Sequence, residues 1–208
     1  MKAYIYVGGA IDPARITEHP KGGDLLIAAD SGWHNAVTLG ERPSLLLGDF
    51  DSYGEGELPD GVEIIRVPAE KDLTDTQLAV DLALQRGARE IVIIGGLSGR
   101  LDHTLSNLAI LEHLYGIGVH AVINDGFNRA RFLRSSSMLL ARGAYSYLSL
   151  IAADTEVKGV EIDGVKYPLK KAKLQRSYQY AVSNELTGNC AFIAVRKGGI
   201  YIIESADK

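Results

Sequence analysis

The first 125 residues alternate short apolar runs with segments of helical pattern. The apolar runs have the length and composition typical of strands, and they lie at 4–9, 24–30, 45–50, 63–68, 90–96 and 119–125. The run at 90–96 is apolar nearly throughout, as expected for a strand that is buried on both faces. Helical patterns at 34–40, 72–86 and about 102–115 separate these runs, and Gly40 and Gly87 are placed to end the first two. The apolar face predicted for the second helix consists of Leu78, Ala79, Leu82 and Ala83. This alternation predicts a parallel α/β architecture.

The pattern changes after about residue 130. Short β-branched or aromatic runs follow one another at 130–134, 137–142, 145–151, 160–169, 177–183, 190–196 and 200–205. Turn signals separate them, including Asp163-Gly164 and Gly198-Gly199. The absence of a convincing helical pattern predicts a second, all-β domain, a small sandwich or barrel.

Composition narrows the class of protein. Apolar residues make up 46% of the chain and charged residues 23%, which is typical of a globular protein. The net charge of −4 argues against a nucleic-acid binder with a basic surface. No apolar run approaches the roughly 20 residues of a membrane span, and the N-terminus does not resemble a signal peptide, so we expect a cytoplasmic protein. The one cysteine, Cys190, excludes an internal disulfide and a Cys-based zinc site, and we expect it to be buried.

Aspartates follow five successive predicted strands. They are Asp30, the pair Asp49 and Asp51, the pair Asp72 and Asp75, Asp102, and Asp125. Because parallel strands end at one edge of their sheet, where open α/β sheets bind ligands, we expect these side chains to share that edge. Asp49 and Asp51 are two residues apart on an extended segment and so point to the same side. Carboxylate oxygens suit Mg²⁺, so the pair predicts a magnesium site, with a polar turn after a strand as the alternative.

Several of these residues also have a structural interpretation. Asp72 and Asp102 could cap the helices that start near them, and Asp75 suits the dipole of the first. Lys71 and Arg100 stand where a phosphate chain needs cations, but each could simply pair with its neighbouring aspartate. The glycine-rich stretch 95–103 lies between a strand and a helix, where backbone N–H groups can approach a phosphate. It matches neither the dinucleotide-binding nor the P-loop motif.

Six motifs, in order along the chain, resemble those of thiamine pyrophosphokinases. They are ADSG (29–32), GDFDS (48–52), KDLTD (71–75), GGLSGRLDHTLSN (95–107), YPL (167–169) and SNEL (183–186). The resemblance implies an N-terminal, parallel-sheet, Rossmann-like α/β/α domain over 1–127, which binds ATP and Mg²⁺. It implies a smaller, all-β, sandwich-like domain over 128–208, which binds thiamine. It further implies a homodimer with active sites at the subunit interface, and transfer of the diphosphoryl group of ATP to the hydroxyl of thiamine, giving thiamine diphosphate and AMP.

The same resemblance implies roles for individual residues. Asp49, Asp51 and Asp75 correspond to metal-binding carboxylates, and Asp72 and Asp102, with Arg100, to further catalytic residues. Phosphate contacts fall to Lys71, Arg100 and His103. Other parts of the ATP and thiamine site correspond to Asp30, Ser31, Gly32 and Asn107, and the second-domain contacts with thiamine to Ser183 and Asn184. Trp33 and Tyr178 are the candidates for an aromatic side chain that stacks on thiamine.

Three other functions use similar residues. A kinase that moves only the γ-phosphoryl group would release ADP instead of AMP. A Mg²⁺-dependent phosphohydrolase would act on a phosphate ester without an acceptor alcohol. A nucleotide-binding sensor would bind ATP tightly without turnover.

Overall fold

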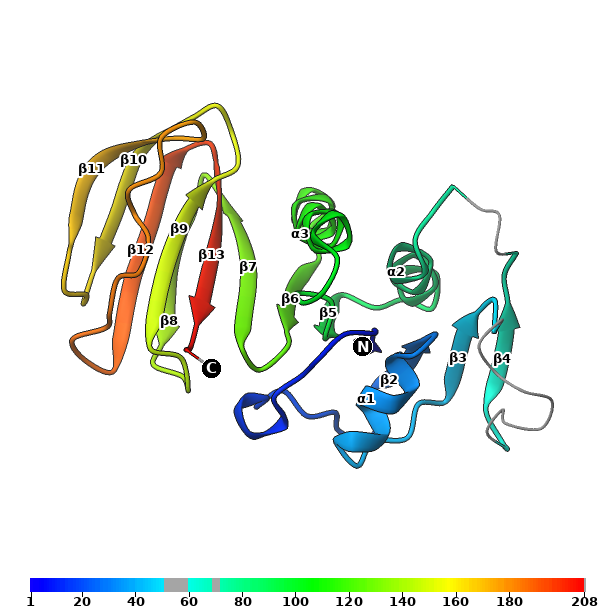
Figure 1. Cartoon of the computed structure of the whole chain (residues 1–208). Coiled ribbons are helices and arrows are strands. Elements are labelled where there is room, and N and C mark those ends of the chain that lie inside the picture. Colours follow the sequence, from blue (N-terminus) through cyan, green and yellow to red (C-terminus); the bar gives the residue numbers. More distant parts are fainter. Residues whose placement is uncertain (51–59, 69–71, 208) are drawn as a thin grey trace. The chain divides into compact units, whose positions relative to one another are not determined.

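A computed structural model of the chain describes residues 1–50, 60–68 and 72–207. The contacts divide the chain into two compact units, unit 1 over Met1–Gly126 and unit 2 over Phe127–Lys208. The fold is mixed α/β, with helices confined to unit 1 in the described ranges (Figure 1).

The described residues of unit 1 form six parallel strands in the order β4-β3-β2-β1-β5-β6. The strands are β1 (Lys2–Tyr6), β2 (Leu25–Ala29), β3 (Leu45–Gly48), β4 (Glu63–Arg66), β5 (Glu90–Ile94) and β6 (His120–Asn124). Each overlaps an apolar run, so the predicted parallel α/β alternation is confirmed. The chain builds the sheet outward from β1 to β4 and then returns to place β5 on the other side of β1. The strand order therefore reverses between β1 and β5.

Three α-helices and one 3₁₀ turn connect these strands. The helices are α1 (Gly32–Thr38), α2 (Asp75–Gln85) and α3 (Leu101–Gly116), and the turn is η1 (Pro13–Arg15). In Figure 1, α2 and α3 cover one face of the unit 1 sheet and α1 lies against the other. Gly87 follows the C-terminus of α2 with φ of 89°, a left-handed conformation that costs glycine little.

The capping expectations for the two longer helices are wrong. Thr74 caps α2, where its side chain accepts a hydrogen bond from the Gln77 N–H, so Asp72 lies before the cap. Arg100 occupies the cap position of α3 and makes no side-chain capping bond. The buried stripe of α2 is Thr76, Ala79, Val80 and Ala83, so it contains two of the four residues expected there. Leu78 and Leu82 flank this stripe and are half-buried.

The core of unit 1 lies on both faces of the sheet, because successive strand residues point to opposite sides. On one face Tyr4 and Tyr6 of β1 pack with Ile94 of β5 and Ala36 of α1. Their neighbours Ala3 and Ile5 are fully buried as well. The last four residues of β5 are all buried, which confirms the expectation of a strand covered on both faces.

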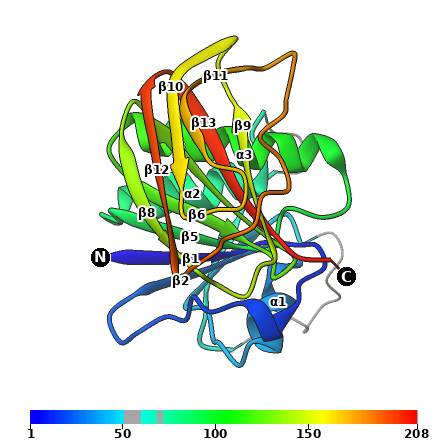
Figure 2. The ribbon, with the colours of Figure 1, turned by 90° about the vertical axis from the view of Figure 1, so that its left-hand side faces the viewer.

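Unit 2 is built of strands alone in its described residues, as predicted. One antiparallel group has the order β7-β13-β9, and a separate sheet has the order β11-β10-β12-β8 (Figure 2). The strands are β7 (Asn128–Arg134), β8 (Ser137–Ala141), β9 (Tyr147–Ala152), β10 (Glu156–Asp163), β11 (Leu169–Gln175), β12 (Cys190–Lys197) and β13 (Gly199–Ser205).

Two details of unit 2 differ from expectation. The run 177–183 forms no strand of its own, whereas the lysine-rich segment Leu169–Gln175 does. Cys190 is exposed, although it was expected to be buried. Ala191, Ile193 and Val195 fill the buried face of β12, so the alternation of the strand turns Cys190 outward.

A buried ion cluster joins two strands of unit 2. Glu204 of β13 is 3% exposed and accepts hydrogen bonds from Arg129 Nε and from an Arg129 terminal nitrogen, both at 2.7 Å. Arg131 contacts the same carboxylate at 2.6 Å. Both arginines belong to β7, so the cluster holds β7 and β13 together at their buried face.

Candidate active site

A pocket of about 290 Å³ opens in unit 1 at the carboxyl ends of β1, β2 and β5. It lies where the strand order reverses, the position at which open α/β sheets bind ligands. Loops after these three strands and the first turns of α2 and α3 form its wall. The lining residues are Val7, Gly8, Gly9, Ala29, Asp30, Ser31, Thr74, Asp75, Thr76, Gly96, Ser98, Arg100, His103 and Asn107. Six of the residues proposed from sequence are thus gathered in one place: Asp30, Ser31, Asp75, Arg100, His103 and Asn107.

The acidic wall of the pocket consists of Asp30 and Asp75. Asp30 has φ of 50°, a left-handed conformation that is uncommon outside glycine. Its carboxylate lies against the last residue of β3, because a Cβ added to Gly48 would stand 2.2 Å from Asp30 Oδ1. Asp75 is the first residue of α2 and is half-buried. The two carboxylates therefore come from separate elements: Asp30 follows β2, and Asp75 begins α2.

This donor set fits Mg²⁺. The ion takes oxygen ligands and in nucleotide sites uses one or two carboxylates, completed by water and substrate phosphates. Within the ranges that the structure describes, no three Asp, Glu, His or Cys side chains group closely enough to hold a metal ion by themselves.

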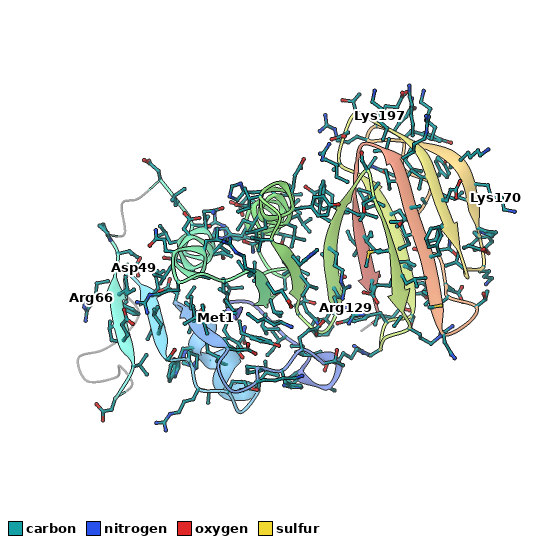
Figure 3. The ribbon with its side chains drawn as sticks, turned by 180° about the vertical axis from the view of Figure 1, so that it is seen from behind. Met1, Asp49, Arg66, Arg129, Lys170 and Lys197 are labelled. Atoms are coloured by element: carbon teal, nitrogen blue, oxygen red, sulfur yellow. The ribbon has the colours of Figure 1, made fainter. Side chains whose placement is uncertain are left out.

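Among the described residues, the predicted Asp49 and Asp72 do not line this pocket. Asp49 is half-buried directly after β3, and Arg66 at the end of β4 is labelled near it in Figure 3. Asp72 is exposed ahead of α2. Asp51 and Lys71 fall outside the described residues. Asp125 was also expected at the edge of the sheet where the parallel strands end, and it is fully buried.

Gly32 has a packing role in α1. It is buried at the first position of the helix, and a Cβ there would lie 2.0 Å from the Tyr6 carbonyl oxygen. Only glycine lets α1 begin this close to β1. The loop that carries Ser31 is thereby held beside the pocket.

Glycines and small polar side chains form the rest of the pocket. A Cβ on Gly8 would stand 2.5 Å from Ser31 Oγ, and one on Gly9 would stand 2.7 Å from Ser98 Oγ. Asn35 fixes the same loop by donating from Nδ2 to the carbonyl oxygens of Val7 and Gly9, at 2.7 and 3.0 Å. The backbone after β1 is therefore exposed to a ligand and rigidly held.

Asn107 secures the loop after β5. It is 4% exposed, and its Nδ2 donates to the Gly96 carbonyl oxygen at 2.8 Å. Gly96 has φ of 77°, and a Cβ there would lie 2.7 Å from the same amide nitrogen. The side chain of Asn107 therefore shapes the glycine turn at the pocket.

Arg100 forms an ion pair with Asp102, the alternative to a phosphate contact that the sequence left open. It contacts Asp102 through two hydrogen bonds, of 3.1 and 2.6 Å, and both side chains are exposed. The Arg100 guanidinium lowers the pKa of Asp102 to about 2, and the His103 N–H also donates to this carboxylate. In turn Asp102 raises the pKa of Arg100. The pair stays charged at all ordinary pH values and holds Arg100 at the mouth of the pocket.

The residue assignments made from sequence did not include several residues that line the pocket. Thr74 and Thr76 stand at the start of α2, and Gly8 and Ser98 line the loops after β1 and β5. The capping pattern Thr74 to Gln77 could have placed Thr74 at the helix end. Ser98 lies in the glycine-rich stretch 95–103, which was expected to approach a phosphate, but the local pattern does not distinguish Gly8 from a residue of an ordinary turn.

The predicted thiamine contacts in unit 2 have distinct environments. Ser183 is exposed, with φ of 55°, and its N–H donates to Ser149 Oγ at 3.0 Å. Asn184 is 7% exposed, and its side chain is hydrogen-bonded to backbone groups. Of the aromatic candidates, Tyr178 is exposed, whereas Trp33 packs against the core around Leu46.

No helix within the described ranges is both long enough and apolar enough to span a membrane.

Two family models match the chain in succession. Residues 18–123 match the model described as "Thiamin pyrophosphokinase, catalytic domain". Residues 138–200 match the model described as "Thiamin pyrophosphokinase, vitamin B1 binding domain". The first match contains the lining residues of the unit 1 pocket other than Val7, Gly8 and Gly9, and the second contains Ser183 and Asn184.

Named relatives and solved structures agree with these matches. A thiamine pyrophosphokinase of Bacillus subtilis (strain 168) is 29% identical over 188 residues, 88% of each chain. Thiamin pyrophosphokinase 1 of Caenorhabditis elegans is 24% identical, over 79% of this chain and 71% of that protein. The crystal structure of thiamine pyrophosphokinase from Bacillus subtilis covers 100% of both chains, with a TM-score of 0.89 and 26% identity. The structure from Geobacillus thermodenitrificans has a TM-score of 0.85 and 28% identity, over 100% of this chain and 99% of that one. The chain belongs to the thiamine pyrophosphokinase family.

Proposed function

We propose that the chain transfers the diphosphoryl group of ATP to the hydroxyl of thiamine, giving thiamine diphosphate and AMP. One observation carries the proposal: the pocket at the point of strand reversal joins two carboxylates, Arg100, His103 and two helix N-termini. The match of both family models to the chain, in order, then selects this reaction among phosphoryl transfers. The position of this pocket at the strand reversal also supports a Rossmann-like description of unit 1. A cytoplasmic location stays a prediction.

Binding of the triphosphate is the first task of the pocket. The N-termini of α2 and α3 favour anionic oxygens, although the Gln77 N–H already donates to Thr74 and the His103 N–H to Asp102. Arg100 and His103 add donors at the same mouth. The glycine loop after β1, held by Asn35, lets backbone N–H groups approach a phosphate without side chains between them.

Positioning accounts for most of the expected catalysis. The thiamine hydroxyl must attack the β-phosphorus in line with the departing AMP oxygen, and a fixed geometry removes much of the entropic barrier. The residues that would hold Mg²⁺ are Asp75 and Asp30 of the pocket, together with Asp49 and Asp51, which follow β3 in the sequence. The ion would neutralise charge on the phosphates when bound. A pocket carboxylate accepts the hydroxyl proton, and Arg100 stabilises negative charge that develops on the leaving group.

Product analysis tests this proposal. The full chain is incubated with ATP, thiamine and MgCl₂, and the products are identified by mass. Equal amounts of AMP and thiamine diphosphate are expected. ADP with thiamine monophosphate would establish a γ-kinase instead, and free phosphate without a thiamine product would establish a hydrolase. Tight ATP binding with no product would favour a sensor. Omission of Mg²⁺ with excess chelator should abolish turnover, and full turnover under those conditions would refute the metal role.

We also propose a homodimer whose active site combines unit 1 of one subunit with unit 2 of the other. Asp75→Asn and Ser183→Trp should each be inactive alone, because one loses the pocket carboxylate and the other blocks the second-domain contact. Mixed after unfolding and refolding together, they should regain about a quarter of the wild-type activity, since half of the random dimers carry one intact site of two. A mixture without activity would place each complete site within one subunit.

A further inference from the structure

A hollow of about 540 Å³ opens on the four-stranded sheet of unit 2. Four cations from β10, β11 and β12 line it, Lys158, Lys171, Lys173 and Arg196, and Glu161 and Gly159 lie among them. None of these residues is among those assigned above to ATP, Mg²⁺ or thiamine. The volume lies in the range of about 300–1,000 Å³ that is typical of small-molecule sites. We call this feature the basic hollow.

An irregular stretch of β10 shapes the basic hollow. Val157 and Val160 are both fully buried although they are three residues apart, a spacing that puts side chains on opposite faces of a regular strand. Gly159 accounts for this, because it has φ of 64° and the register against β11 shifts between Lys158 and Val160. The bulge therefore lets Lys158 and Glu161 line the basic hollow together.

Arg196 of β12 lies directly against this bulge. A Cβ added to Gly159 would stand 2.7 Å from Arg196 Cβ and 3.1 Å from Arg196 Nε. The arginine side chain therefore lies close over the Gly159 backbone, where only glycine leaves room for it. Gly159 thus adopts the left-handed conformation of the bulge and also seats the guanidinium group at the basic hollow.

One carboxylate holds two of the lysines. Lys158 Nζ donates to Glu156 at 2.7 Å, and Lys173 of β11 pairs with the same carboxylate. The hydrogen bonds from Lys158 and Lys173 lower the pKa of Glu156. The two lysines are opposite each other in the register of β10 and β11, so Glu156 offsets the repulsion between two like charges.

Lys171 and Arg196 have no such carboxylate. In the part of the chain that the structure describes, neither side chain takes part in an ion pair, and both are exposed. Four cations against Glu156 and Glu161 leave a net charge of +2 at the basic hollow. The surplus belongs to a wider asymmetry, because unit 2 has 13 Lys and Arg against 7 Asp and Glu, in a chain with 22 against 26.

A compact polyanion has the chemistry that these features recognise. A guanidinium group can bind phosphate oxygens in pairs, and an ammonium group binds them as a point charge. The cations come from three strands, so a chain of linked phosphates can contact more of them than a single phosphate can. Duplex nucleic acid is bound along an extended basic surface rather than in a hollow of this size.

We propose that the basic hollow is a second binding site, lined by other residues than the pocket of unit 1, for a small anion with two or more linked phosphate groups. Arg196 and Lys171 supply the uncompensated charges, and Lys158 and Lys173 complete the site. The proposal goes beyond the diphosphoryl transfer proposed above and does not depend on it, because binding is measured without turnover.

Calorimetric titration of the full chain with inorganic tripolyphosphate tests the site, in low-salt buffer with a chelator that removes divalent metal. Two variants remove one charge from the basic hollow, Lys171→Gln and Arg196→Gln. Each has a matched control that removes a charge from the adjacent exposed residue, Lys170→Gln and Lys197→Gln, which Figure 3 labels. The pocket of unit 1 is the same in all four variants, so differences within a pair report on unit 2.

Lys171→Gln and Arg196→Gln should each raise Kd about tenfold, as expected for loss of one charge-assisted contact, and their controls less than about twofold. Gly159→Ala should raise Kd to a similar degree without a change in net charge, because the added Cβ displaces the Arg196 side chain. Equal losses within each matched pair would show only diffuse surface charge and overturn the proposal, as would a wild type that does not bind. If Gly159→Ala fails to fold in a parallel urea titration, the matched pairs decide.

Other anions define the ligand class. Inorganic phosphate should bind at least about tenfold more weakly than tripolyphosphate, and equal affinity would overturn the requirement for linked phosphates. ATP and inorganic diphosphate, titrated in the same way, distinguish a nucleotide from a bare phosphate chain. A loss of affinity in Arg196→Gln for either ligand supports the site, and the tighter ligand identifies the source. Tighter binding of a short DNA duplex than of tripolyphosphate would assign this face to nucleic acid and overturn the proposal.

Discussion

Replacing Gly48 by alanine should separate the orientation of Asp30 from its charge. Gly48 ends β3, and a Cβ at this position would stand 2.2 Å from Asp30 Oδ1 and 3.1 Å from its Cγ. A carbon and an oxygen in contact need more than 3 Å, so the carboxylate must move by about 1 Å. The backbone of Gly48 does not have a positive φ, so alanine meets no conformational barrier there.

The structure sets the size of the expected effect. The atoms displaced belong to the end of a short side chain, so overpacking should cost no more than about 1–3 kcal/mol of stability. A catalytic group shifted by about 1 Å can lower the rate about 100-fold, and we expect a loss of that order in kcat/KM for ATP. The assay is AMP release at fixed thiamine, with urea unfolding in parallel to measure stability.

The control for Gly48→Ala is Gly22→Ala. An added Cβ at Gly22 meets no atom within 4 Å, so this variant should retain wild-type activity. Asp30→Asn and the double variant complete a cycle. If both changes act through the Asp30 carboxylate, the double variant should be hardly worse than Asp30→Asn. Activity of Gly48→Ala equal to that of Gly22→Ala, or full additivity in the cycle, would refute a role for the orientation of Asp30.

Three further outcomes are expected. Asp75→Asn should lower kcat at least about 100-fold with the unfolding midpoint within a few degrees of wild type, and near-normal AMP release would exclude Asp75 from the site. Glu204→Gln should cost about 3–5 kcal/mol in urea unfolding, because it leaves Arg129 buried without its carboxylate; a change below about 1 kcal/mol would show the cluster is dispensable. Arg134 lowers the pKa of Asp154 through hydrogen bonds, so that ion pair stabilises the fold above the unfolded pKa near 4. The stability difference between wild type and Asp154→Asn should therefore be greatest at neutral pH and shrink as pH falls below about 4, and a pH-independent difference would contradict this.

The carboxyl-edge argument predicted much of the candidate site because it depends only on strand direction. Asp30, Asp75 and Arg100 come from separate loops, yet parallel strands must end at one edge, so they meet in one pocket. The sequence does not show which of the aspartates line the pocket, because no local pattern reveals where the strand order reverses. Asp72 lies before the cap of α2 and Asp125 is buried beyond β6, although both follow strands.

Unit 2 was less predictable for a physical reason. The segment of β11 is lysine-rich and lies at the edge of its sheet, where register shifts against β10 break the alternation of side chains. Segment 177–183 has the composition of a strand, but Tyr178 forms an isolated bridge to Gln175 of β11, and the Ala181 carbonyl oxygen accepts from the Leu150 N–H of β9. The contact between Asn184 and Tyr167 spans 17 residues, and no local pattern predicts such a bond.

The charges of the described residues in the pocket of unit 1 predict that a bare nucleotide would be a poor ligand for it. The charged side chains among its described lining residues are two aspartates and Arg100, and the charge of Arg100 is already compensated by Asp102. A triphosphate oxygen about 4 Å from a carboxylate is repelled by about 4 kcal/mol at the effective dielectric constant of a protein surface. A helix N-terminus returns about 0.3–1 kcal/mol, so two of them cannot offset two such contacts. A divalent cation between carboxylates and phosphates turns each repulsion into an attraction. We infer that the acidic wall formed by the described residues selects the metal–nucleotide complex over the free nucleotide.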